Sequence, residues 1–163
     1  MNFQVGDKVV HWSYGPGQVI QVDEKRISGR NDVYYVVRVR DLTLWVPVDG
    51  ATLHSLRPPT SKREFRRLFE ILRGPGERLS DDRLERKAHL TGHMRDGTLE
   101  SICRAIRDLS TFSYRKKLND YDAALLERAR KFLLDEWEIS FSVSVSDAQR
   151  QLDLLLEEGR SSQ

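Results

Sequence analysis

The sequence predicts an α+β protein, in which a small antiparallel β unit precedes a unit made of about five helices. The first third of the chain holds short runs rich in valine and aromatic residues, separated by turn-forming residues. After residue 59, apolar residues recur every three or four positions, as in amphipathic helices. Consecutive prolines, Pro58 and Pro59, separate the two patterns. We therefore expect two domains, residues 1–58 and 59–163.

Four strands are expected in the first domain. Gly, Asn, Asp and Ser residues between the apolar runs provide the turns. Short strands with tight turns predict a strongly bent sheet, such as an SH3-like or Tudor-like barrel. The expected strands are Lys8–Trp12, Gln18–Val22, Val33–Arg40 and Leu42–Val48.

A glycine-rich turn, Gly15-Pro16-Gly17, follows the first of these runs. Phosphate-binding loops lead from a strand into a helix, whose first N–H groups face the anion. Here the next segment is QVIQV, which is typical of a strand, and neither a GxxxxGK[ST] nor a GxGxxG motif is present. We expect these glycines to supply unusual backbone angles and not a nucleotide site.

The second domain begins with a capping box, Ser61-x-x-Glu64, and its first helix ends at the GPG of residues 74–76. Ser80 is expected to cap a second helix over Asp81–Met94, and Thr98 a third. A fourth is expected over Asp120–Ile139. Residues 140–146, SFSVSVS, are expected to form a loop, after which Ser146 caps a fifth helix.

Charge is unevenly distributed along the chain, although the formal net charge is only +2. Lys and Arg outnumber Asp and Glu by 15 to 9 in residues 59–117, whereas acidic residues lead by 10 to 5 in residues 118–163. A segregated basic segment suggests a polyanion such as DNA as partner, because neutralised phosphates release counterions. The alternative is that these charged helix faces only contact water.

No catalytic or metal-binding motif is found, so we expect neither an enzyme nor a cofactor or small-molecule substrate. His89 and His93 have helical i, i+4 spacing, but the sequence around them does not complete HExxH. The lone cysteine, Cys103, lies on an apolar stripe and is expected in the core. A single cysteine, no long apolar run and no signal peptide indicate a cytoplasmic protein that does not enter a membrane.

Five aromatic residues in the strand region allow two interpretations. They could form a cage for methylated lysine or arginine, as in Tudor-like domains that bind modified peptides. We favour the alternative that a sheet this small needs them in its core. The residues are Trp12, Tyr14, Tyr34, Tyr35 and Trp45.

In the second expected helix, Arg83, Arg86 and Lys87 have i, i+3 and i+4 spacing, so they are expected to share one face. A positive helix face can bind a phosphate backbone. The order of motifs along nearly the whole chain resembles the CarD family of bacterial RNA polymerase-binding transcription regulators. The motifs are VGD-x-VV, YGPG and LWVP in the first domain, and RKAHL, MRDGTLESICRAIRDLS and LNDYDAALLERARKFLLDE in the second.

The resemblance implies that the first domain, which is also similar to the polymerase-interacting domain of transcription-repair coupling factor, binds the β-subunit lobe of RNA polymerase. Sheet-edge pairing and two basic positions support this docking in the family. Lys25 matches one of these positions, and Trp45 replaces the other. We expect Lys25, Arg26 and Trp45 to make the polymerase contact.

The resemblance also implies that the helical domain contacts promoter DNA upstream of the melted bubble, where the family inserts a tryptophan into the minor groove. Asp82 stands at that tryptophan position, and the apolar Leu84 follows two residues later. Lys87 matches a family lysine, whereas Arg86 replaces an aromatic residue. The expected DNA-binding residues are Arg83, Leu84, Arg86 and Lys87.

The sequence thus predicts a nucleoid-associated CarD-like regulator that modulates the stability of the open promoter complex. The departure at Asp82 leaves open a family member that binds polymerase without the DNA wedge. A Tudor-like peptide-binding scaffold is a third possibility.

Overall fold

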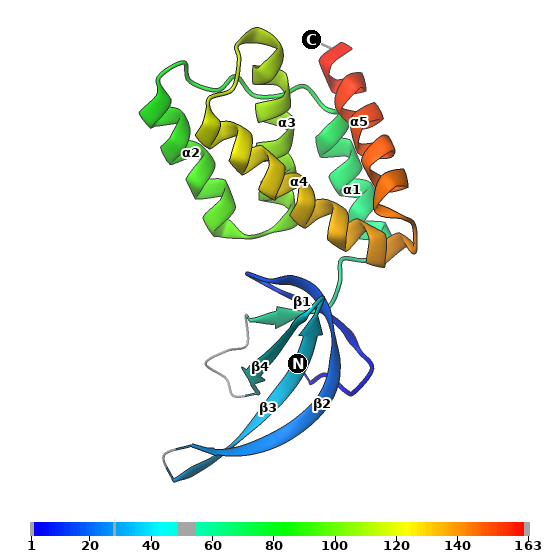
Figure 1. Ribbon diagram of the computed structural model, residues 1–163. Coiled ribbons are helices and arrows are strands. Elements are labelled where there is room, and N and C mark those ends of the chain that lie inside the picture. Colours follow the sequence, from blue (N-terminus) through cyan, green and yellow to red (C-terminus); the bar gives the residue numbers. More distant parts are fainter. Residues whose placement is uncertain (1, 28, 49–54, 162–163) are drawn as a thin grey trace. The chain divides into compact units, whose positions relative to one another are not determined.

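The computed structural model describes residues 2–27, 29–48 and 55–161. The chain divides into two compact units, Met1–Pro59 and Thr60–Gln163. The first contains an antiparallel sheet and the second contains five helices among the described residues (Figure 1). The predicted α+β class is confirmed.

The sheet has five strands in the described residues, in the order β4-β3-β2-β1-β5, and all neighbours are antiparallel. Within the described residues this sheet, which was expected to resemble an SH3-like or Tudor-like barrel, is not closed. Strand β5 has only two residues and pairs with β1, which leaves β4 and β5 as the edges of the described sheet. The strands are β1 (Lys8–His11), β2 (Gly15–Ile27), β3 (Arg30–Val39), β4 (Leu42–Pro47) and β5 (Leu56–Arg57).

Strand β2 is much longer than its apolar run predicts. Its second half, from Asp23 to Arg26, is polar, yet it pairs with β3 as far as Ile27 opposite Arg30. The register shifts between Val19 and Gln21, and such bulges bend a strand and increase its twist. The result is a long hairpin that curves away from the rest of the sheet, as the two blue ribbons in Figure 1 show.

Gly15, Pro16 and Gly17 are the first residues of β2, directly after the turn at residues 12–14, so this segment leads into a strand and fits a structural role. Gly15 has a φ of +87°, an angle that residues with a side chain rarely adopt. Gly17 allows a close approach of strands, because a Cβ added there would lie 2.6 Å from the carbonyl oxygen of Arg38. One face of the sheet then forms the core, with Val9, Val19, Tyr35, Val37, Val39, Val46 and Leu56.

Four of the five helices have a polar N-cap whose side chain accepts a backbone N–H: Ser61, Asp82, Thr98 and Asn119. Asp82, and not Ser80, caps the second helix, so that helix starts two residues later than predicted. Residues 140–141 extend the fourth helix and Val145 already begins the fifth, so only 142–144 of the predicted 140–146 loop are non-helical. The helices are α1 (Lys62–Arg73), α2 (Arg83–Asp96), α3 (Leu99–Arg115), α4 (Asp120–Phe141) and α5 (Val145–Ser161).

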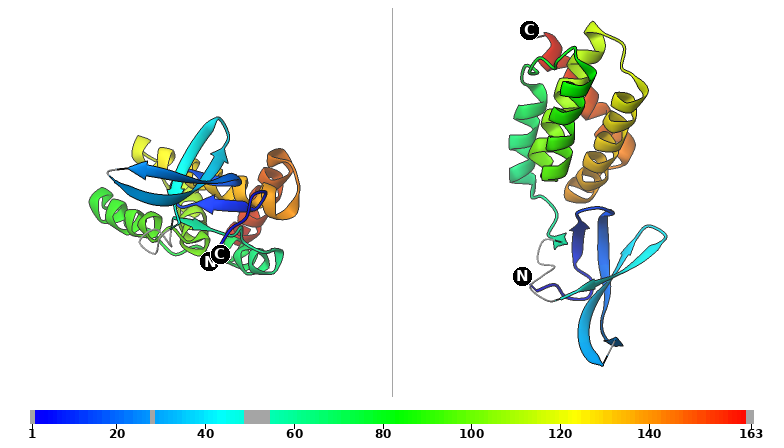
Figure 2. Two further views of the ribbon diagram at one scale, coloured as in Figure 1. Left: turned by 90° about the horizontal axis from the view of Figure 1, so that it is seen from below. Right: turned by 90° about the vertical axis from the view of Figure 1, so that its left-hand side faces the viewer.

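Helix α3 is central in this unit, because it packs against each of the other helices (Figure 2). One apolar cluster joins α1, α3, α4 and α5, and it includes the fully buried Phe65, Ile106 and Leu133. Cys103 lies in this cluster, as predicted, and burial raises the pKa of its thiol. A second cluster around Leu90 and Leu109 holds α2 and α4 against α3. No described helix has the length and apolar character needed to cross a bilayer.

Candidate functional site

Lys25 and Trp45 form a surface contact in the sheet unit. The Lys25 ammonium lies 3.5 Å from the centroid of the Trp45 ring, within the range of a cation–π interaction. Trp45 is 38% exposed, and the edge of the Tyr34 ring meets it at a centroid distance of 6.3 Å. We call Lys25, Tyr34 and Trp45 the Lys25–Trp45 patch.

Strand register explains how these three side chains meet. Tyr34 lies opposite Asp23 in β2 and opposite Pro47 in β4. Side chains two residues apart point to the same face of a sheet. Lys25, Tyr34 and Trp45 therefore share the face opposite the core. Arg26 is exposed but is the next residue after Lys25, so it projects to the other face and is not part of the patch.

The patch borders a free sheet edge. Among the described residues, β4 pairs only with β3, so the outer backbone groups of residues 42–46 are not used by another strand of this sheet. Such an edge can accept an extended segment from a partner through main-chain hydrogen bonds. Trp45 lies within this strand, which places an aromatic side chain beside the backbone that would pair.

The first turns of α2 carry a second group of exposed side chains. Arg83 and Lys87 are exposed four residues apart, and Leu84 is 69% exposed although it is apolar. The Lys87 ammonium lies 4.8 Å from the ring centroid of Tyr121 on α4. We call Arg83, Leu84, Lys87 and Tyr121 the α2 surface.

Asp82 caps the N-terminus of α2. Its carboxylate accepts a hydrogen bond from the Leu84 N–H at 3.0 Å, and a negative charge at a helix N-terminus is favourable. Asp82 is thus an N-cap, and the exposed apolar side chain at this helix end is Leu84.

Arg86 does not share the exposed face of Arg83 and Lys87, so that part of the prediction is wrong. It is only 6% exposed, and its Nε donates to Asp122 of α4 at 2.8 Å. Its Nη1 donates to the backbone carbonyls of Ser80 and Asp81 at 2.9 and 3.3 Å. The Arg86 side chain can pack inside the helical unit because these acceptors form hydrogen bonds with its guanidinium group.

The aromatic residues of the sheet unit are not gathered in one core. Tyr35 is buried, as that interpretation requires, but Trp12 and Tyr14 are exposed. Both of these rings lie against His11, whereas Trp45 contacts Tyr34. Tyr35 packs against Phe3 in a third contact, so the five aromatic residues do not form a single cage in the described residues.

Family models match both units of this chain. Residues 3–59 match the CarD-like/TRCF RID domain, and residues 67–153 match the CarD C-terminal domain. The chain belongs to the CarD family. A relative from Bacillus subtilis (strain 168), named "Putative transcription factor YdeB", is 26% identical over 140 residues. That match covers 84% of this chain and 91% of the relative.

The CarD family consists of transcription regulators with a polymerase-interacting domain and is not a known enzyme class. Sequence reasoning about this CarD-like chain missed two residues of the surfaces described above. Tyr34 precedes the buried Tyr35 on β3, so the two side chains point to opposite faces of the sheet. Once the register of β2 and β4 is known, this alternation places Tyr34 in the patch. Tyr121 has no such signal, because its contact with Lys87 joins residues 34 positions apart.

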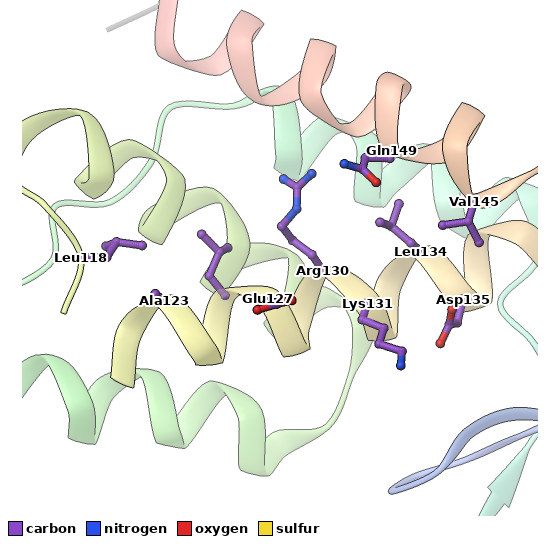
Figure 3. A pocket seen from close by; sticks show the side chains of 10 residues that line it. Leu118, Ala123, Glu127, Arg130, Lys131, Leu134, Asp135, Val145 and Gln149 are labelled. Carbon is purple, nitrogen blue, oxygen red and sulfur yellow. The ribbon is translucent and has the colours of Figure 1, made fainter. Parts of the chain in front are cut away.

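A groove on the helical unit contains none of the predicted site residues. It has a volume of about 430 Å³ and runs along α4 to the start of α5 (Figure 3). Leu118, Leu126, Leu134 and Val145 supply apolar lining, and Glu127, Arg130, Lys131 and Asp135 supply charge. Arg130 already binds Asp153 at 2.7 Å. We assign the candidate interfaces to the Lys25–Trp45 patch and the α2 surface.

Proposed function

We propose that this CarD-family protein binds the β-subunit lobe of bacterial RNA polymerase through its sheet unit and contacts promoter DNA through its helical unit. The observation that carries the proposal is the exposed Lys25–Trp45 contact beside the free edge of β4. Bound in this way, the protein would act in the cytoplasm on the nucleoid and would modulate open-complex stability.

Main-chain pairing along β4 would supply much of the polymerase affinity, and the patch would select the partner. An exposed tryptophan held by a neighbouring cation is a suitable interface residue, because Trp side chains often dominate binding energy. Lys25 keeps a positive charge within 3.5 Å of the ring centroid, so it can also meet a carboxylate of the partner. Arg26 would contribute from the other face of the hairpin, where it is exposed.

The α2 surface has the chemistry needed for DNA. Arg83 and Lys87 can bind consecutive phosphates, and each neutralised phosphate makes association more sensitive to salt. Leu84 is the exposed apolar side chain that could enter the minor groove between them. Arg86 has no part in this contact because it is buried against Asp122.

A protein with these contacts would change promoter opening by differential binding. It would shift the equilibrium toward whichever promoter state it binds more tightly, without making or breaking bonds. A tenfold change in the ratio of open to closed complexes requires about 1.4 kcal/mol of differential affinity.

Co-purification with RNA polymerase core tests the sheet interface. The expected result is that the full chain is retained and that Lys25→Glu and Trp45→Ala each weaken retention at least tenfold. Lys8→Glu is the matched control, since Lys8 is an exposed lysine on β1, two strands from β3. Equal retention of parent, Lys25→Glu and Trp45→Ala would rule out the patch as the polymerase contact.

A second candidate function is polymerase binding without a DNA wedge. Asp82 favours it, because this N-cap carboxylate stands where the family has its tryptophan. Stopped-flow measurement of promoter opening separates the two candidates. Parent protein that binds polymerase but leaves open-complex lifetime unchanged would support the second candidate.

A further inference from the structure

Side chains that commonly bind metal ions converge from three parts of the helical unit. Glu77 lies in the connection between α1 and α2, His89 lies on α2, and Asp108 lies on α3. One ligand atom from each lies within 4.8 Å of the other two. His89 therefore has acidic neighbours that its i, i+4 spacing from His93 does not reveal.

The candidate ligand groups have few hydrogen-bonding partners in the described residues. Asp108 is 1% exposed, and its two donors, Arg107 Nε and the Glu77 N–H, both contact Oδ1 at 2.9 Å. Within the described residues, no hydrogen bond or ion pair reaches Oδ2, the Glu77 carboxylate or the His89 ring. Two donors on Oδ1 hold the Asp108 carboxylate in place, which leaves its second oxygen available to a cation.

The three ligand atoms would need to move only slightly to bind one ion. Two ligand atoms that each lie about 2.1 Å from a zinc ion are at most about 4.2 Å apart. Closing a separation of 4.8 Å to that limit is a small adjustment for the exposed side chains of Glu77 and His89. His93 follows His89 by one helical turn, with a ring-centroid distance of 4.8 Å, but it is not among the three residues whose ligand atoms converge, so water would complete the coordination.

We propose that Glu77, His89 and Asp108 bind a divalent first-row transition metal ion, with Zn²⁺ as the best-suited ion. An imidazole beside two carboxylates favours Zn²⁺ over Mg²⁺ or Ca²⁺, which prefer oxygen ligands alone. The ion would link the α1–α2 connection, α2 and α3. This proposal does not depend on polymerase or DNA binding.

Metal titration of the untagged full chain tests the site. Co²⁺ is the spectroscopic probe, because coordinated nitrogen ligands change its visible absorption, and Zn²⁺ binding is measured by calorimetry. The expected result is one equivalent bound, with affinity at least tenfold weaker in His89→Asn and Glu77→Gln. Both variants change exposed side chains, so the fold should persist, as circular dichroism without metal will verify.

Glu138→Gln is the matched control, since Glu138 is an exposed glutamate on α4 outside the cluster. Unchanged metal affinity in this control and a Zn²⁺-dependent rise in Tm that His89→Asn abolishes would support the site. The proposal would be overturned if the parent shows no saturable Co²⁺ spectrum, or if the parent and His89→Asn bind with equal affinity.

Discussion

The carboxylate of Asp122 on α4 accepts a hydrogen bond from the guanidinium of Arg86 on α2, at 2.8 Å between Oδ2 and Nε. Both side chains are buried, and the Arg86 guanidinium also stacks over Phe112 of α3 at 4.7 Å. The ion pair thus joins α2 and α4, and the stacking contact of Arg86 adds α3. It also fixes the helix that presents Arg83 and Lys87, so the stability of the fold and the candidate DNA surface are connected through Arg86.

Replacing Asp122 with alanine should destabilise the helical unit by about 3–5 kcal/mol, because Arg86 would remain charged and buried without its carboxylate. Urea unfolding followed by circular dichroism measures this change. Asp120→Ala is the control, since Asp120 is an exposed acid in the same first turn of α4. Replacing both partners by apolar residues, Arg86→Met with Asp122→Leu, should recover most of the loss. A loss below about 1 kcal/mol for Asp122→Ala would contradict the structural role of the pair.

Asp82→Ala should lower helical-unit stability by about 1 kcal/mol, because the Leu84 N–H loses its acceptor. Asp82→Ser and Asp82→Asn keep a capping oxygen and should lose less. Thermal unfolding of the three variants measures the difference. If all three have the same Tm, the capping role of Asp82 is not supported.

The local patterns in the sequence predict most of the elements and miss features that depend on distant partners. Arg86 lies four residues before the buried Leu90, so its place on the inward face of α2 was readable from the spacing. Its acceptor, Asp122, lies 36 residues further on and could not be paired with it from the sequence. Strands were predicted from runs of apolar residues. The polar half of β2 was therefore missed, although its backbone pairs with β3.

Register explains which part of the candidate site was predictable. Lys25 and Trp45 were expected at the same interface because of the family resemblance, but their contact requires the pairing of β2, β3 and β4. Closure of a barrel would require pairing between the two edge strands, β4 and β5, and no local pattern specifies it. The two-residue β5, which pairs with β1, could not be anticipated from strand propensity.

The sheet unit should be less stable at acidic pH because of His11. Burial lowers the pKa of His11 below 6.5, and its Nδ1 accepts the backbone N–H groups of Ser13 and Tyr14, which requires the neutral ring. The unfolded chain therefore binds more protons near pH 6, so stability rises with pH toward 7 and falls as pH drops below 6.5. NMR titration of His11, together with melting of the full chain at pH 5.5 and 7.5, measures the effect. A His11 pKa at or above 6.5 would contradict this prediction.

Lys87→Ala should weaken promoter DNA binding and make it less sensitive to salt. If Lys87 neutralises one phosphate, the slope of log affinity against log salt should decrease by about 0.9. Its ammonium is exposed and lies over the Tyr121 ring, so removing it should leave the fold intact. Fluorescence anisotropy with a promoter duplex between roughly 50 and 200 mM salt measures the slope. Lys62→Ala, at an exposed lysine of α1, is the control and should keep the parent slope. Equal slopes for the parent and Lys87→Ala would remove Lys87 from the DNA contact, and the α2 surface would then lose its main electrostatic argument.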